Sequence, residues 1–174
     1  MKNTDTKEKI LEMLFKFPTT KFHIREISRI LKISPPAISK AIKQLEREKM
    51  VVSNKNVVYE IKANLDNINF KNLKRVNNLK EIYLSGLFNH LSEKFPLDTI
   101  ILFGSYSRGE DTERSDIDIA IIGTKEKILD LENFEKSLKR KINLNFYSKL
   151  KGIEINLRSN ILNGITLAGG VDLA

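Results

Sequence analysis

Apolar residues recur at helical spacing through the first fifty residues of the chain. Three segments carry such a stripe, residues 6–17, 24–31 and 34–49. The third segment opens with Ser34-Pro35, a pair typical of a helix start, because proline has no N–H to leave unsatisfied at the first helical position. The pattern therefore predicts three amphipathic helices.

Beyond the third helix the pattern changes to two short β-prone runs. Residues 50–53 and 57–61 are joined by Asn54-Lys55-Asn56, and asparagine tolerates the positive φ of a tight turn, so we predict a β-hairpin. Three helices followed by a hairpin resemble the winged helix-turn-helix family, whose core looks like residues 22–52. The resemblance covers about the first 64 residues.

The resemblance implies that the third helix enters the major groove of double-stranded DNA and that the hairpin follows phosphates. The matching residues of this chain are Ser34, Pro36, Ser39, Lys40 and Lys43 on the helix and Lys55 on the hairpin. Charge agrees with this interpretation, because residues 1–62 carry a net +7 and residues 63–174 only +1. A homodimer reading two half-sites is the expected form. A dimerisation or protein-docking module is the alternative.

Residues 65–96 predict a linker helix. Its apolar positions follow one another at spacings of three or four and consist of Leu73, Val76, Leu79, Tyr83, Leu87 and Leu91. The helix ends near Pro96, and Gly86 weakens it or allows a close approach. We expect this apolar seam, formed by the residues just named, to pack on the second module or to pair with the same seam of another copy of the chain.

The second module begins with a buried strand over residues 99–103. A second strand over residues 115–123 alternates, so that Asp116 and Asp118 share one face and the isoleucines share the other. Two carboxylates so close repel each other, and a divalent cation relieves that repulsion. Mg²⁺ is the expected cofactor, since it prefers carboxylate and phosphate oxygens.

The turn after the first of these strands suits a phosphate. Gly104 lets the backbone approach a ligand, and Ser105 offers a hydroxyl and an N–H where a helix begins. Gly104-Ser105, ten residues and Asp116-x-Asp118 resemble the signature of the nucleotidyltransferase superfamily that includes DNA polymerase beta. Arg108-Gly109 is similar to the minimal archaeal and bacterial members, and the match covers residues 97–147.

The resemblance implies an overall α+β chain whose second module is a small α/β domain with a mixed sheet. In it, Asp116 and Asp118 hold Mg²⁺ and are catalytic, and Ser105 grips the triphosphate. Gly104, Arg108 and Asn143 also lie by the nucleotide. The reaction passes a nucleoside monophosphate from a nucleoside triphosphate to a hydroxyl. We predict a winged-helix domain over 1–64, a linker helix over 65–96 and a nucleotidyltransferase domain over 97–174.

The chain departs from this family at the third carboxylate, which often serves as the general base. Asn143 stands where an aspartate is expected, and asparagine carries no charge and takes no proton. The nearest alternative carboxylate is Glu154, in a helix predicted over residues 149–162. A basic run before Asn143 is interpreted as a solvated helix end, with attraction of an acidic acceptor as the alternative; it comprises Lys136, Lys139, Arg140 and Lys141.

Three functions stay open on these residues. The first is a Mg²⁺-dependent nucleotidyltransferase fused to a DNA-binding module. The second is a transcriptional regulator that senses nucleotides with little or no catalysis. The third is an antitoxin-type enzyme that attaches AMP to a protein. The acceptor, whether protein, RNA or a small molecule, is not specified.

Composition excludes several other classes. The 174 residues contain no cysteine and two histidines, which excludes disulfides, thiolate zinc sites and cysteine nucleophiles. The longest apolar stretches are far shorter than the roughly 18 residues that span a bilayer. The N-terminus has no apolar signal core, so we expect a cytoplasmic protein without membrane partners.

Overall fold

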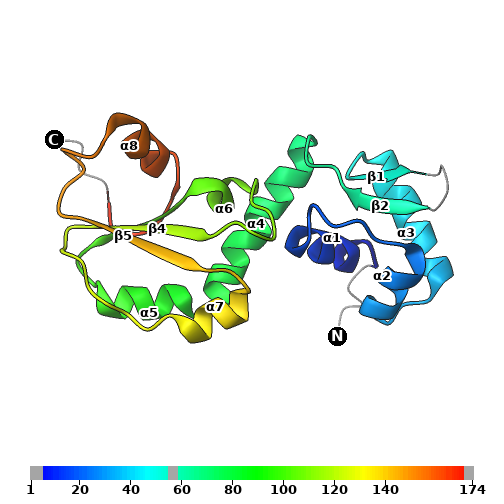
Figure 1. Cartoon of the computed structure of the whole chain (residues 1–174), viewed down its shortest axis with the longest axis horizontal. Coiled ribbons are helices and arrows are strands. Elements are labelled where there is room, and N and C mark those ends of the chain that lie inside the picture. The colour runs from blue at the N-terminus through cyan, green and yellow to red at the C-terminus, as the bar shows by residue number, and fades with distance from the viewer. Residues whose placement is uncertain (1–5, 55–58, 171–174) are drawn as a thin grey trace. The chain divides into compact units, whose positions relative to one another are not determined.

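The computed structural model describes residues 6–54 and 59–170 (Figure 1). The chain divides into two compact units, Met1–Lys74 and Arg75–Ala174, and each is described by itself. Helices and strands occur in both units, so the predicted α+β class is confirmed. The three-part division at residues 64 and 96 stays a prediction.

The first unit is a winged helix. It contains three helices and a two-stranded antiparallel hairpin: α1 (Thr6–Lys16), α2 (Ile24–Leu31), α3 (Pro35–Arg47), β1 (Val51–Asn54) and β2 (Glu60–Ala63). The three apolar stripes meet in one core, where Leu14, Ile27 and Ile42 are completely buried. The predicted order of three helices and a hairpin is therefore confirmed.

The hairpin differs from its prediction at the second strand. Val51 pairs with Ala63 and Asn54 with Glu60, so the observed strand lies further along the chain than residues 57–61. Phe22 bridges to Ile61, which ties the segment before α2 to this strand. Residues 55–58 lie outside the described residues, and with them the predicted DNA contact Lys55.

The predicted linker helix is two helices, which corrects the expectation of one. α4 (Ile68–Leu84) and α5 (Leu87–Lys94) are separated at Gly86, whose φ of 78° only glycine adopts easily. The apolar seam is also wrong within α4, because Val76 is 66% exposed whereas Asn78 is only 3% exposed. Asn78 is buried by hydrogen bonds to other segments, which hydropathy spacing does not reveal.

The second unit contains a four-stranded mixed sheet in the order β5-β4-β3-β6. Its strands are β3 (Thr99–Phe103), β4 (Ile117–Ile122), β5 (Ile142–Tyr147) and β6 (Ile165–Ala168). β4 and β5 run parallel, and the other two pairs are antiparallel. The connections include three short helices, α6 (Gly104–Arg108), α7 (Glu132–Leu138) and α8 (Ile155–Leu162). The expected mixed sheet is confirmed.

The two faces of this sheet are covered differently. Ile117, Ile119 and Ile121 pack with residues of α5 and α7, whereas Ala120 packs with Ile161 of α8 on the opposite face. Figure 1 shows α5 and α7 on one side of the sheet and α8 on the other. Because strand residues alternate, Asp118 lies on the α8 face.

Within the described parts of the chain, no helix combines the length and the apolar character needed to cross a membrane.

Candidate active site and nucleic-acid interface

Two carboxylates converge where β4 begins. Asp116 lies just before the strand and Asp118 is its second residue, on either side of the buried Ile117. In the sheet, Asp118 is opposite Phe103 of β3 and Asn143 of β5. The Asn143 side chain donates from Nδ2 to Asp116 Oδ2 at 3.1 Å and to Asp118 Oδ1 at 3.2 Å. Both carboxylates therefore approach one amide nitrogen.

The turn between β3 and α6 lies against the same carboxylates. A Cβ on Gly104 would be 2.5 Å from Asp118 Oδ2, so no other residue fits there unchanged. The φ of Gly104 is 73°, in the left-handed region that favours glycine. Ser107 Oγ donates to the Gly104 carbonyl at 2.8 Å, which holds the turn and places the half-buried Ser105 at the start of α6.

The residues present fit a magnesium ion. Asp116 and Asp118 offer hard oxygen ligands, and phosphate and water oxygens normally complete the shell of Mg²⁺. Asn143 has an amide oxygen as well as the nitrogen that bridges the pair, so a rotated side chain can add a neutral ligand. The described residues include no group of three or more His, Cys, Asp or Glu side chains arranged for a metal.

Arg108 contacts other protein side chains. Its Nε donates to Glu110 at 2.9 Å and its Nη1 donates to Asn160 of α8 at 2.9 Å. The bond to Asn160 joins α6 to α8, whereas Glu110 lies in the loop that follows α6. A direct contact between Arg108 and a nucleotide stays a prediction.

Glu154 lies at the N-terminus of α8. It precedes α8, so its predicted place within a helix is wrong. Its carboxylate accepts hydrogen bonds from the backbone N–H of Asn156 and of Leu157, each at 3.0 Å. These bonds lower the pKa of Glu154. The side chain caps the helix by satisfying N–H groups that have no partner within it.

A buried polar network supports the loop that leads to Asp116. Asn78 of α4 donates to Asp111 Oδ1 at 2.7 Å and to the Tyr106 carbonyl at 2.9 Å. Arg140 Nη2 lies 3.9 Å from Asp111 Oδ2. Burial, with the nearby Asp111, raises the pKa of the Tyr106 hydroxyl. Sequence reasoning missed this network. Asn78 lies outside the predicted apolar positions of α4, so hydropathy gave no signal for its burial.

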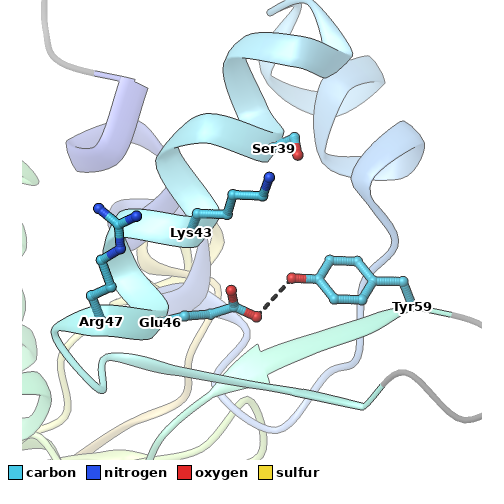
Figure 2. A pocket seen from close by; sticks show the side chains of 5 residues that line it. All are labelled: Ser39, Lys43, Glu46, Arg47 and Tyr59. Atoms are coloured by element: carbon cyan, nitrogen blue, oxygen red, sulfur yellow. Dashed lines mark hydrogen bonds between the residues drawn. The ribbon is translucent and has the colours of Figure 1, made fainter.

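The winged helix presents a basic surface along α3. Among the predicted DNA contacts, Ser34, Pro36, Lys40 and Lys43 are exposed and Ser39 is half-buried. Figure 2 shows Ser39, Lys43 and Arg47 along α3 with Tyr59 across from them. These residues and Glu46 line a pocket of about 570 Å³. The predicted residues Ser39 and Lys43 are thus brought together beside residues that were not predicted.

Tyr59 also borders a second pocket, of about 410 Å³, on the side of α2. Its lining includes Arg25 and Arg29, which sequence reasoning missed although their spacing of four places them on one helical face. The basic surface therefore comprises Arg25, Arg29, Lys43 and Arg47 around Tyr59.

A carboxylate lies within this basic surface. The Tyr59 hydroxyl donates to Glu46 Oε1 at 2.7 Å, and the Ser53 hydroxyl donates to the same oxygen (Figure 2 draws the Tyr59 bond). Burial, with the nearby Glu46, raises the pKa of Tyr59. Because Glu46 lies on α3 and Ser53 on β1, these bonds fasten the helix to the hairpin.

Two solved structures resemble part of the chain. A ZitR variant from Lactococcus lactis has 24% identity and a TM-score of 0.39, over 55% of this chain and 64% of that one. The adhesin competence repressor AdcR from Streptococcus pyogenes has 23% identity and a TM-score of 0.37, over 54% of this chain and 69% of that one.

Sequence comparisons concern the second unit. Residues 84–166 match the family model of the nucleotidyltransferase domain. "Putative protein adenylyltransferase MJ0126" from Methanocaldococcus jannaschii is 40% identical over 70 residues, 38% of this chain and 70% of that protein. MJ1379, with the same description and organism, is 46% identical over 28% of this chain and 48% of its own length. With its paired carboxylates and glycine turn, this chain belongs to the nucleotidyltransferase family.

Proposed function

We propose that the second unit transfers a nucleoside monophosphate, with ATP as the donor, to a hydroxyl group of an acceptor. The observation that carries this proposal is the convergence of Asp116 and Asp118 on one point beside the Gly104 turn. Two carboxylates at that place suit a cation that accompanies a triphosphate, and the turn offers backbone N–H groups to phosphate oxygens.

The carboxylates and the turn have different roles in the proposed reaction. Asp116 and Asp118 would hold Mg²⁺, which when bound neutralises charge on the phosphates and favours the ionised acceptor. Ser105 and the start of α6 orient the triphosphate. The acceptor oxygen forms a bond to the α-phosphorus while the bond from that phosphorus to the bridging oxygen of the β-phosphate breaks, and pyrophosphate leaves. The hydroxyl proton passes to water.

Asn143 determines how the proton leaves. An asparagine amide does not accept a proton at neutral pH, so Asn143 cannot act as the general base. Its two hydrogen bonds instead hold the carboxylates together against their repulsion. Loss of a positioned base typically costs about 10²–10⁴-fold in rate, so we expect slow transfer. A regulator that senses the nucleotide without chemistry is the limiting case of the same site.

We propose a protein as the acceptor. The relatives from M. jannaschii are described as protein adenylyltransferases, and the chain matches 70% and 48% of their lengths. An RNA acceptor is the alternative, and transfer of label from ATP to RNA rather than to protein would identify it.

A second function rests on the other unit. We propose that the winged helix binds double-stranded DNA through α3, as a homodimer on two half-sites. The four basic residues around Tyr59 support this, because phosphate contacts by Lys and Arg dominate affinity for DNA. Its test is the salt dependence of duplex binding.

Calorimetry with ATP tests the nucleotide site. We expect heat of binding with Mg²⁺ and little with EDTA, and we expect Asp116→Asn to abolish binding or to weaken it at least about 100-fold. Glu126→Gln removes a carboxylate from an exposed loop and serves as the matched control. Binding that EDTA and Asp116→Asn leave unchanged would contradict the proposal.

A further inference from the structure

β5 forms an edge of the sheet directly beside the carboxylate pair. Asn143 on β5 is opposite Asp118 on β4, whereas the other edge, β6, is separated from β4 by β3. A strand added to β5 would lie about 4.8 Å from it. Its side chains on the face of Asn143 would therefore stand beside the site.

The backbone groups of β5 alternate between β4 and the outer edge. The carbonyls of Lys141 and Tyr147 accept from Ile117 and Gly123, at 2.8 and 2.9 Å. The alternate residues Ile142, Leu144 and Phe146 consequently direct their N–H and C=O groups outward. In the described parts of the chain, no strand pairs with β5 on that side.

One end of this outer edge is already closed. The outward N–H of Ile142 donates to Glu135 Oε1 at 2.9 Å. The outward groups of Leu144 and Phe146 lie beyond that bond, so the available edge is short. Short or partly blocked edges are typical of strands that must not pair indiscriminately.

Charge at the two ends of β5 favours an acidic partner. Lys139 and Lys141 precede the strand, Lys149 and Lys151 follow it, and all four are exposed. A second copy pairing edge to edge in the antiparallel sense would bring lysines of one end against lysines of the other. Like charges so placed repel, whereas acidic residues flanking an extended segment would complement them.

We propose that the outer edge of β5 binds an extended, acidic segment of the acceptor protein by adding it as a fifth strand. This inference rests on the proposed transferase function. The main-chain hydrogen bonds would supply affinity, and the lysines would select acidic flanks. A hydroxyl on the added strand, on the face of Asn143, would then form the bond to the α-phosphorus, with pyrophosphate leaving and the proton passing to water.

The test uses the full chain and a defined probe, the peptide Asp-Glu-Val-Thr-Val-Thr-Val-Glu-Asp. Leu144→Pro removes the outward N–H without removing a bond to β4, and proline is tolerated at such edge positions. Leu144→Ala is the matched control, because it loses the same side chain but keeps the N–H. A second pair compares Lys149→Glu/Lys151→Glu with Lys125→Glu, an exposed lysine in the loop after β4.

We expect the NMR amide signals of Leu144 and Phe146 to shift when the peptide is added. Leu144→Pro should weaken binding by about 10-fold relative to Leu144→Ala, as expected for the loss of one hydrogen bond. The lysine double variant should weaken it relative to Lys125→Glu. A peptide N-methylated at alternate residues should not bind, because it cannot form the ladder.

Three results would overturn the inference. The first is equal binding of the peptide to Leu144→Pro and Leu144→Ala, together with equal binding to Lys149→Glu/Lys151→Glu and Lys125→Glu. The second is equal binding of the methylated and the unmethylated peptide. The third is displacement of the peptide from Leu144 and Phe146 by an oligouridylate of the same charge. ATP calorimetry on the same samples separates the two proposals. Failure of Mg²⁺-dependent ATP binding contradicts the transferase, whereas the amide shifts report on the edge alone.

Discussion

The two units of the chain use charge in opposite ways. In the winged helix, basic residues are spread over the exposed surface of α2 and α3. Two carboxylates, Glu26 and Glu46, lie among them, and Glu46 accepts hydrogen bonds from two hydroxyl groups. In the nucleotidyltransferase unit, two carboxylates converge on one amide at a strand start, against a glycine turn.

Because of this contrast, we expect the two units to respond differently to mutation. A surface that binds phosphates sums many weak, screened interactions, so each substitution has a graded effect. The paired carboxylates depend on a backbone approach of one turn to one strand. At this site, one added methyl group or one added charge is therefore expected to displace the carboxylates.

The largest effect is expected at Asn143, where the resemblance to the family leads us to expect a third carboxylate. Asn143→Asp supplies a group that can accept the acceptor proton, and we expect transfer with Mg²⁺ to rise by about 10²–10⁴-fold. The same variant places a third negative charge beside Asp116 and Asp118, so it should be less stable in EDTA than in Mg²⁺. Label transfer and thermal melts measure the two effects. An equal rise in Asn143→Ala would show that the new carboxyl is not a base.

Gly104→Ala tests the approach of the turn to Asp118. The added Cβ would meet Asp118 Oδ2 and would sit at a positive φ, at a cost of about 1–3 kcal/mol in the free energy of unfolding. We expect ATP affinity to fall by about 100-fold, because the carboxylate must move. Gly152→Ala is the control, since its φ is also positive but no atom lies near the added Cβ. Equal effects of the two variants on ATP binding would contradict the explanation.

A graded effect is expected on the winged helix. Replacing Lys43 and Arg47 together by alanine should lower duplex affinity by about 10-fold at moderate salt. The slope of log affinity against log salt should become shallower by about one for each phosphate that the protein no longer neutralises. Filter binding or fluorescence anisotropy across a salt series measures both. Lys125→Ala in the second unit should leave the slope unchanged, and a slope unaffected by the double variant would argue for a docking role instead.

Tyr59→Phe tests the bond between the helix and the hairpin, because it removes one hydroxyl without changing the charge of the first unit. The bond to Glu46 disappears, and we expect a decrease of about 0.5–1.5 kcal/mol in the stability of the first unit. Urea unfolding followed by far-UV circular dichroism measures it. Tyr83→Phe, an exposed tyrosine, is the control. A larger loss of DNA affinity than of stability would indicate that Tyr59 positions the hairpin.

The smallest effect concerns the cap of α8. Hydrogen bonds from the Asn156 and Leu157 backbones lower the pKa of Glu154, so its carboxylate stabilises the fold above its ordinary value of 4.5. That contribution is lost as pH falls through the lowered pKa. We expect Glu154→Gln to melt at a slightly lower temperature than the natural chain at pH 7, and we expect this difference to shrink as the pH falls below 4.5. A difference that persists at low pH would contradict this cause.

Much of the fold follows from local patterns. The apolar stripes of α1 to α3 and the alternation of β4 need only the neighbouring residues, so both the winged helix and the strand face of Asp118 were predictable. Gly86 signalled a weak point in the predicted linker helix, and the helix is interrupted there. The burial of Asn78 in place of Val76 was not predictable, because the Asn78 side chain bonds to Tyr106 and Asp111, which lie far along the chain.

The reactive groups are evident from the residues alone: two carboxylates on one strand face, a glycine-serine turn, and an asparagine at the position where the family resemblance predicts a third acid. The folded chain was needed to show that the Asn143 amide bridges both carboxylates, that Glu154 caps a helix, and that Tyr59 joins α3 to the hairpin. The two kinds of information differ in how far apart along the chain the interacting residues lie. Periodicity records which face a residue occupies, whereas these hydrogen bonds form between segments whose meeting is set by packing and strand order.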